Sequence, residues 1–312
     1  MPAPLLRADV EAAARRIGPY VRHTPVISLE ADLVGTGEPV VAKLDLLQPT
    51  GSFKVRGATS LLTGTEVPDA GVVAASGGNF GLGIAWAAAR LGLAATIVTP
   101  ASAPEAKLAP IRSLGATLEL VDGAYADALA AAERLVARTG ALAAHAYDDP
   151  LVVAGQGTAA MELLADTEVD TVLVACGGGG LLAGTVAGVG DQARVVAVET
   201  EGTPTLHAAL AAGHPVDIEV AGLAASALGA RRVGAHAWAV RDRLAAALLV
   251  TDAEVAATQR WLWTHARLVA EPGGAVALAA LLHGRYRPGP HERVGVLVCG
   301  ANTDPASVVA AT

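Results

Sequence analysis

The stretch TVLVACGGGGLLAGTVAGVG, from Thr171 to Gly190, decides the fold class of this chain. It has the length and apolar character of a membrane span, and it contains no charged residue. Four consecutive glycines would nevertheless destabilise a helix at its centre, because glycine is among the weakest helix formers. A short buried strand, a glycine loop and a new helix fit the same letters. The stretch therefore predicts a strand–loop–helix unit of an α/β protein.

The rest of the chain repeats this alternation of short apolar runs and alanine-rich segments. Further runs typical of buried parallel strands are GVVAAS (71–76), AATIVTP (94–100), ATLELV (116–121), RVVAVE (194–199) and RVGVLVC (293–299). Helices are expected between them, at residues 80–91, 104–114 and 124–139. This alternation predicts twisted, mostly parallel sheets with helices on both faces. Such sheets bind ligands at the carboxyl ends of their strands.

Length and composition limit the classes of function. The chain has 312 residues, of which 53% are hydrophobic and 17% charged, as in one large or two ordinary globular domains. The net charge is -8 and no basic cluster stands out, so nucleic acid is not expected as a partner. The two cysteines form neither a disulfide framework nor a metal-ligand spacing, and the N-terminal residues do not resemble a signal peptide. We expect a cytoplasmic protein that does not enter the membrane.

The glycine loop after the strand is a candidate anion site. It consists of Gly177, Gly178, Gly179 and Gly180. Because these residues have no side chains, their N–H groups can face a ligand at the N-terminus of the next helix. No lysine follows as in nucleoside-triphosphate loops, and the dinucleotide spacing is absent, so a single phosphate fits better. A tight turn that needs small residues is the alternative.

Two further segments carry candidate functional side chains. The loop after the run GVVAA consists of Ser76, Gly77, Gly78 and Asn79. Its N–H groups and polar side chains could hold a carboxylate, although serine and asparagine are equally typical of helix caps here. The segment QPTGSFKVRGA places Lys54 directly after Phe53, in a chain poor in charge. Taken alone, Lys54 could be an ordinary surface lysine and Phe53 a core residue.

These segments, in this order, resemble the fold type II pyridoxal-phosphate (PLP) enzymes, in particular the threonine/serine dehydratase and serine racemase family. The matching motifs run through almost the whole chain: LLQPTGSFKVRGA, SGGNFGLGIAWAA, AGQGTAAMELL, CGGGGLLAG, VETEG, EPGGAVALAAL and VLVCGAN. The resemblance implies the two-domain α/β architecture of the tryptophan synthase β-like fold, and a homodimer. Residues 1–65 and 144–312 would form the larger, PLP-binding domain. Residues 66–143 would form a smaller inserted domain that carries the SGGN loop.

The resemblance also assigns roles to individual residues. Lys54 would form the Schiff base with PLP and then act as the base that removes the Cα proton of the substrate. Phe53 would cover one face of the cofactor ring, and Asn79 would bond its hydroxyl oxygen. Cys299 matches the serine or cysteine that faces the ring nitrogen, although an unpaired cysteine is more often a small buried hydrophobic residue. The PLP phosphate would be held by Gly177, Gly178, Gly179, Gly180 and Leu181, and the substrate carboxylate by Ser76, Gly77, Gly78 and Asn79.

The function expected on these grounds is dehydration of a β-hydroxy amino acid, with L-threonine and L-serine first among the substrates. Without a carboxylate beside it the ring nitrogen lacks a full positive charge, which favours prompt elimination over long-lived carbanions. The products would be a 2-oxo acid and ammonia. The alternatives are a β-replacement synthase or serine racemase of the same fold and, more distantly, a non-catalytic α/β binding protein.

Three positions depart from the family pattern. Phe80 stands where many relatives have histidine, next to the loop expected to bind substrate. Glu199 matches the first ligand of a divalent-metal site, but Thr205 stands where its aspartate belongs, so Glu199 is only a weak candidate and no metal is expected. Gly77 occupies the position of the serine that donates the second proton in serine racemases. Since glycine has no donor, racemisation is expected to be negligible beside elimination.

Overall fold

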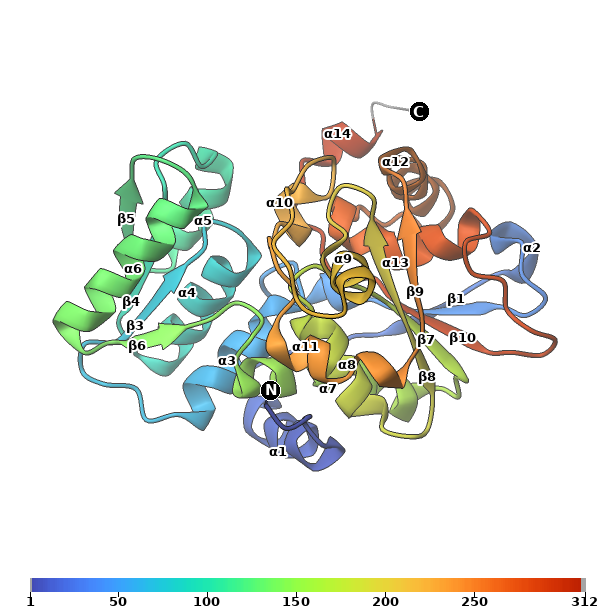
Figure 1. Cartoon of the computed structure of the whole chain (residues 1–312), viewed down its shortest axis with the longest axis horizontal. Coiled ribbons are helices and arrows are strands. Elements are labelled where there is room, and N and C mark those ends of the chain that lie inside the picture. Colours follow the sequence, from blue (N-terminus) through green and yellow to red (C-terminus); the bar gives the residue numbers. More distant parts are fainter. Residues whose placement is uncertain (1, 310–312) are drawn as a thin grey trace.

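A computed structural model describes residues 2–309 and shows two lobes, each built on one β-sheet (Figure 1). The larger sheet consists, in spatial order, of β1 (Val26–Leu29), β2 (Val40–Lys43), β10 (Val294–Leu297), β7 (Thr171–Ala175), β8 (Arg194–Thr200) and β9 (Leu244–Val250). The smaller sheet consists of β5 (Thr117–Val121), β4 (Ala95–Pro100), β3 (Val72–Ala75) and β6 (Leu142–Ala144). Neighbouring strands are parallel throughout, except that β1 is antiparallel to β2. The expected α/β class is confirmed.

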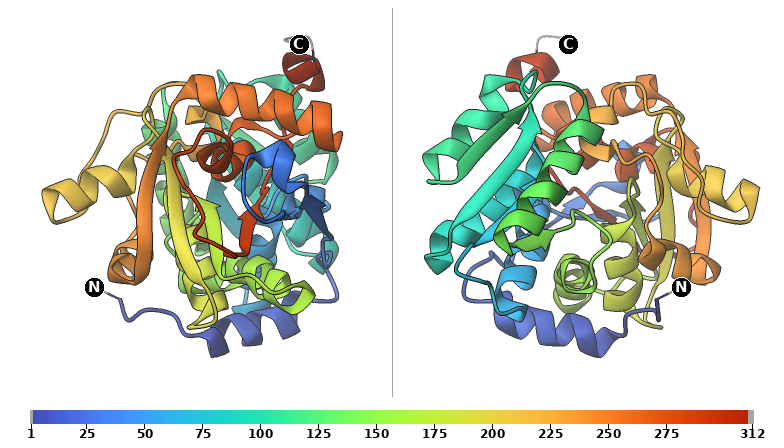
Figure 2. Two further views of the ribbon diagram at one scale, coloured as in Figure 1. Left: turned by 90° about the vertical axis from the view of Figure 1, so that its right-hand side faces the viewer. Right: turned by 60° about the vertical axis from the view of Figure 1, so that its left-hand side comes forward.

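Helices cover both faces of each sheet (Figure 2). One face of the larger sheet packs against α1 (Arg7–Ile17), α7 (Pro150–Asp166) and α8 (Gly180–Val189), and the other against α12 (Asp252–Trp261) and α13 (Pro272–Leu282). The smaller sheet lies between α6 (Tyr125–Thr139) on one face and α4 (Asn79–Leu91) with α5 (Glu105–Ser113) on the other. The shorter helical segments are α2 (Ala31–Val34), η1 (Asp45–Leu47), α9 (Thr205–Ala212), α10 (Ala225–Leu228), α11 (Ala235–Ala239), η2 (Arg241–Arg243), η3 (Leu262–Ala266) and α14 (Pro305–Val309).

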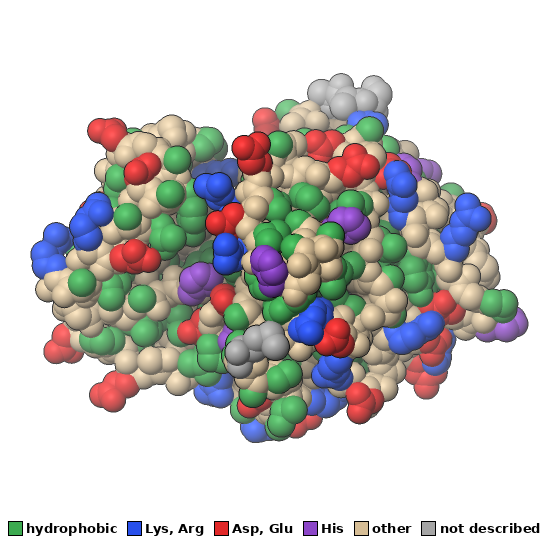
Figure 3. Space-filling model, viewed as in Figure 1, with side chains coloured by type: hydrophobic (Ala, Val, Ile, Leu, Met, Phe, Trp, Pro, Cys, Tyr) green, Lys and Arg blue, Asp and Glu red, His purple; other side chains and the backbone are tan. Residues whose placement is uncertain are grey.

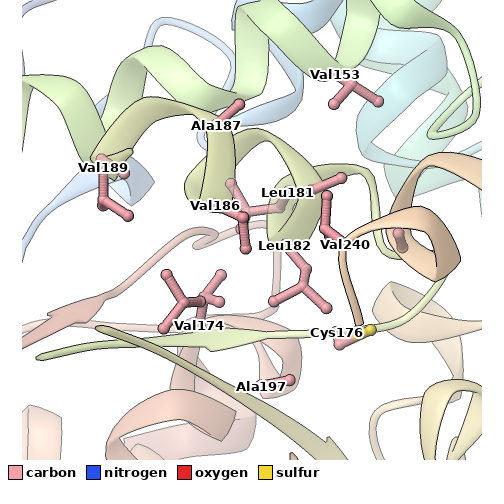
Figure 4. Close-up of a cluster of buried hydrophobic side chains, with 14 of the residues drawn as sticks. Val153, Val174, Cys176, Leu181, Leu182, Val186, Ala187, Val189, Ala197 and Val240 are labelled. Atoms are coloured by element: carbon pink, nitrogen blue, oxygen red, sulfur yellow. The ribbon is translucent and has the colours of Figure 1, made fainter. Parts of the chain in front are cut away.

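The stretch from Thr171 to Gly190 forms β7, the glycine loop and α8, as the sequence predicts. Every residue of β7 is buried, because a parallel strand covered on both faces has no solvent side. Val174 packs on the side of α8, and Leu173 packs on the side of α13. Figure 4 shows Leu182 and Val186 of α8 directed toward Val174. Within residues 2–309, no helix is long and apolar enough to cross a membrane.

Helix α3 (Lys54–Gly64) lies at the junction of the two lobes, where it packs against α7 of the larger lobe and α4 of the smaller (Figure 1). Its residues from Val55 to Leu62 are all buried. The approach to α7 is close, since a Cβ on Gly155 of α7 would lie 2.6 Å from the carbonyl oxygen of Arg56. Glycine is therefore required there, and the packing places Lys54, the first residue of α3, between the lobes.

A buried ion cluster anchors α3 to the larger lobe. The guanidinium of Arg56 is fully buried, and its nitrogens lie 2.7 Å from Asp45 Oδ1 and 2.7 Å from Glu162 Oε1. Lys43 is fully buried as well, with Nζ 3.0 Å from a carboxylate oxygen of Glu162 and 3.0 Å from one of Asp166. Each buried cation thus has carboxylate partners, as the cost of desolvating it requires. The first turn of α3 is held by charge pairs in addition to close packing.

The smaller sheet is formed by residues 72–144, between segments of the chain that build the larger one. We propose that this sheet and its helices form the inserted domain, whose expected limits are residues 66 and 143, with Ala144 completing β6. Acidic and basic side chains are interspersed over the face of the molecule drawn in Figure 3, without a continuous patch of one sign.

Candidate active site

A chamber at the junction of the lobes brings together every residue expected to contact the cofactor. Its walls include Phe53, Lys54, Asn79, Gly177, Gly178, Gly179, Gly180, Leu181 and Cys299. These residues come from the start of α3 and from the segments that follow β3, β7 and β10. The carboxyl ends of three parallel strands therefore converge here, which is where open α/β sheets bind ligands.

Lys54 contributes a partly buried amine to this chamber. Its Nζ donates a hydrogen bond to the carbonyl oxygen of Ala146 at 2.8 Å and lies 5.0 Å from the ring centre of Phe53. Burial lowers the pKa of Lys54 to about 8, although the nearby Cys299 and Glu271 oppose the shift. Compared with an ordinary lysine, a far larger fraction of this amine is neutral near pH 7, and only the neutral amine is a nucleophile or a base.

The glycine loop is enclosed so tightly that side chains could not be accommodated. A Cβ on Gly178 would overlap the ring of Tyr147, and one on Gly180 would lie 2.7 Å from the carbonyl oxygen of Tyr147. Gly179 has φ +87°, and a Cβ there would overlap Ala237. Among the described residues, no backbone or side-chain group accepts a hydrogen bond from the N–H groups of Gly177, Gly178 and Gly179.

These N–H groups stand at the start of α8, whose N-cap residue, Gly179, has no side chain to cap the helix. Free N–H donors at a helix N-terminus attract an anion, and the helix dipole adds to the attraction. The loop therefore fits a phosphate group, which would receive the hydrogen bonds that the chain itself does not supply.

The second loop, from Ser76 to Asn79, lines a wider cleft of about 490 Å³ that also includes Lys54. It follows β3 and opens α4, and all four of its residues are partly exposed. The N–H of Gly78 makes only a long hydrogen bond, 3.4 Å, to Ser76 Oγ. The loop can therefore offer a hydroxyl and N–H groups to a ligand that enters from the cleft. Phe80 lies just inside α4 and is buried, with its ring centre 5.8 Å from Lys54 Nζ.

Cys299 follows β10 and is buried, and its Sγ lies 3.5 Å from the carbonyl oxygen of Gly273. Burial raises the pKa of the Cys299 thiol, and the negative charges of Glu271 and Asp45 raise it further. The group is therefore an uncharged thiol at neutral pH. Its carbonyl oxygen accepts a hydrogen bond from Phe53 N at 2.9 Å, which ties this strand end to the residue before Lys54.

Two residues of the chamber carry no role in the sequence analysis. Tyr147 follows β6, and its ring lies against Gly178 of the glycine loop. Glu271, the N-cap residue of α13, is only 6% exposed and accepts a hydrogen bond from Asn79 Nδ2 at 2.7 Å. Glu271 does belong to the matched motif EPGGAVALAAL, but the motif alone does not show where its carboxylate points.

The weak metal candidate Glu199 serves instead to cap a helix. Its carboxylate accepts hydrogen bonds from Leu206 N and His207 N, both at 2.8 Å, at the start of α9. Thr205 Oγ1, in the position of the expected aspartate, lies 3.0 Å from the same carboxylate. Burial raises the pKa of Glu199 to about 7, against the effect of these donors. In the described part of the chain, no cluster of three His, Cys, Asp or Glu residues could hold a metal ion.

A reactive lysine beside a glycine cradle for an anion defines a class of site that suits a phosphorylated aldehyde cofactor. A family model described as "Pyridoxal-phosphate dependent enzyme" matches residues 17–300, and the chain belongs to this family. The protein is accordingly a PLP-dependent enzyme.

Its relatives match over nearly their whole length. An L-threo-3-hydroxyaspartate ammonia-lyase from a Pseudomonas species is 37% identical over 305 residues, which cover 95% of this chain and 95% of the relative. A phenylserine dehydratase from Ralstonia pickettii is 35% identical over 299 residues, covering 94% and 91%. The crystal structure of a threonine deaminase from the organism abbreviated T.th. is 35% identical, with a TM-score of 0.89 and coverage of 96% and 99%.

Proposed function

We propose that this protein is a PLP-dependent dehydratase, or ammonia-lyase, that converts L-threonine or L-serine to a 2-oxo acid and ammonia. The observation that carries the proposal is the amine of Lys54, which lies in one chamber with the glycine loop and borders the cleft lined by Ser76–Asn79. The relatives named as a dehydratase, a deaminase and an ammonia-lyase support elimination as the reaction.

The residues of the chamber divide among the parts of the cofactor. The N–H groups of Gly177–Leu181 would hold the phosphate, Phe53 would cover one face of the ring, Asn79 would bond the ring hydroxyl oxygen and Cys299 would face the ring nitrogen. When bound, PLP supplies an electron sink for the pair that the Cα–H bond leaves behind.

The chain itself orients the substrate and moves one proton. The Ser76–Asn79 loop would hold the substrate carboxylate with its hydroxyl and N–H groups at the start of α4. Lys54 Nζ would take the Cα proton, and its lowered pKa suits a base that works near neutral pH. Cys299 remains uncharged, so it does not drive the ring nitrogen to a full positive charge. Loss of the β-hydroxyl as water is then favoured over side reactions that need a longer-lived carbanion.

Release of ammonia from L-threonine or L-serine without an added nucleophile tests the proposal. The expected result is equal amounts of ammonia and 2-oxo acid, abolished by borohydride treatment of the PLP-loaded protein. Product that appears only when a thiol or another nucleophile is added would instead identify a β-replacement synthase. A panel that includes 3-hydroxyaspartate and phenylserine ranks the side chains, since the relatives differ in the side chain they are named for.

We further propose that the enzyme works as a homodimer in the cytoplasm. The resemblance of the whole chain to the dehydratase and racemase family supports the homodimer. Sedimentation velocity of the PLP-loaded protein tests it: a single species of twice the mass of one 31.1 kDa chain is expected.

A further inference from the structure

The side-chain amide of Asn79 is held by hydrogen bonds at both of its ends. Its Nδ2 donates to Glu271 Oε1 at 2.7 Å, and its Oδ1 accepts from Asn302 Nδ2 at 2.7 Å. Asn302 Nδ2 also donates to the carbonyl oxygen of Thr50 at 2.8 Å. A chain of hydrogen bonds therefore runs from Thr50 through two amides to one carboxylate.

The direction of this chain follows from which groups can donate. The carbonyl of Thr50 can only accept, so Asn302 must turn its amide nitrogen toward Thr50 and toward Asn79. Asn79 then has to receive that nitrogen with its own oxygen, which leaves its nitrogen facing Glu271. A flipped Asn79 would place its oxygen against a carboxylate and its NH₂ against another NH₂. Each contact would lose a hydrogen bond and gain a repulsion, so one orientation of Asn79 is strongly favoured.

Glu271 is well fixed for this purpose. Its backbone N–H donates to the carbonyl oxygen of Gly300 at 3.0 Å, and a Cβ on Gly300 would overlap its carboxylate. The side chain is thus packed against the segment that carries Asn302, two residues further along the chain. Glycine at position 300 provides the space that the carboxylate occupies.

We infer that Glu271 and Asn302 are positioning residues, which orient the amide of Asn79 so that its remaining N–H, rather than its C=O, serves the cofactor. An amide nitrogen carries two hydrogens, and Glu271 takes one of them. The second can donate to the ring hydroxyl oxygen of PLP, whereas a flipped amide would oppose that oxygen with another acceptor. Such a donor stabilises the ionised form of the ring oxygen. The inference rests on the proposed role of Asn79 in cofactor binding and holds for any amino-acid substrate.

The first test compares two substitutions at position 271. Glu271→Met removes the acceptor, whereas Glu271→Gln keeps an oxygen that can accept from Asn79, and both remove the charge that faces Lys54. We expect Glu271→Met to weaken the binding of PLP to the apoprotein about tenfold and Glu271→Gln to recover most of this loss. The pH at which the absorption spectrum of bound PLP changes should shift upward in the Met variant only. Glu201→Met, at an exposed site, is the matched control.

The second test uses Asn302→Asp, an isosteric change at an exposed position, and so does not depend on the folding of the Met variant. A carboxylate there can no longer donate to Asn79 or Thr50, and we expect the same weakening of PLP binding and the same spectral shift. Equal losses in Glu271→Gln and Glu271→Met would assign the effect to charge and overturn the inference. PLP affinity and spectrum unchanged in Asn302→Asp would overturn it as well. If Glu271→Met does not fold, the result for Asn302→Asp alone decides.

Discussion

The two glycine-containing loops of the site have the same local design and opposite surroundings. Each follows a parallel strand and opens a helix, β7 to α8 in one case and β3 to α4 in the other. In the first loop, an added Cβ on any of the four glycines would come within 3 Å of another atom. In the second loop, a Cβ on Gly78 would meet no atom of the described chain within 4 Å. The glycine loop after β7 is therefore enclosed, and the asparagine loop after β3 is open to the cleft.

This difference matches what each loop is proposed to hold. The cofactor phosphate stays in place through every turnover, so a loop fixed on all sides by Leu228, Tyr147 and Ala237 suits it. The substrate carboxylate enters and leaves each time, so its loop must border an accessible cleft. Glycine serves the first loop because nothing larger fits, and it serves the second by exposing N–H groups. The same residue type thus has two different physical reasons.

The largest effect is expected for Lys54→Ala, which leaves both loops in place. With the loops intact but the amine gone, PLP and substrate have sites to occupy and no base remains at Cα. We expect turnover to fall at least ~10⁴-fold, since proton transfer and covalent attachment are lost together. Lys54→Arg should fail too, because a guanidinium stays protonated. Ammonia release measures the loss, and an unchanged circular dichroism spectrum shows that the fold persists. Substantial activity in either variant would refute the assignment.

The next prediction compares the loops directly. Gly179→Ala places a side chain on a residue with φ +87° and against Ala237, so we expect a loss of about 2–4 kcal/mol in the free energy of unfolding. Its affinity for PLP should fall as well. Gly78→Ala has free space around the new Cβ, and we expect it to change the free energy of unfolding by less than about 0.5 kcal/mol. Urea unfolding of both apoproteins provides the values. Equal losses would show that the loops do not differ in enclosure.

The enclosed loop is predictable from sequence, and much of its enclosure is not. An apolar run that ends in four glycines is a local pattern, and it predicts the strand, the loop and the start of α8. The contact of Tyr147 with Gly178 depends on the path of the chain after β6, and the bond from Asn79 to Glu271 joins residues 192 positions apart. No local spacing encodes either contact. Strand β9, with the sequence LAAALLV, is not among the predicted strands, because alanine is a poor strand former and its run looks helical.

A smaller effect is expected from the amine that lies between the two loops. Because burial lowers the pKa of Lys54 to about 8, the apoprotein should capture PLP at a rate that rises with pH and levels off above about 8. Below that pH the neutral fraction, and with it the rate, should fall about tenfold per pH unit. Stopped-flow absorption of apoprotein mixed with PLP measures it, with Lys54→Ala as the control for reaction at other lysines. A rate still rising steeply at a pH of about 10, where an ordinary lysine titrates, would mean that the amine is not buried.

The smallest effect concerns racemisation and the one crowded position of the open loop. Elimination should dominate in the parent protein because Gly77 offers no proton donor on the second face of Cα. Gly77→Ser alone would not supply one cleanly, since its Cβ would overlap the hydroxyl of Thr99, a buried residue. Gly77→Ser combined with Thr99→Ala removes the obstacle. A positioned donor is typically worth ~10²- to 10⁴-fold in rate, so we expect at least a roughly tenfold rise in D-serine relative to pyruvate.

Chiral chromatography of L-serine incubated with each protein measures this ratio, and Gly77→Ala with Thr99→Ala controls for the added bulk. That control fills the same space without a hydroxyl, so it should leave the ratio at the parent level. A rise in both double variants would mean that loop geometry, rather than a new proton donor, governs racemisation. D-serine formed by the parent protein at a rate comparable to pyruvate would show that another group already donates from the second face. The open loop would then hold a donor that its sequence does not reveal.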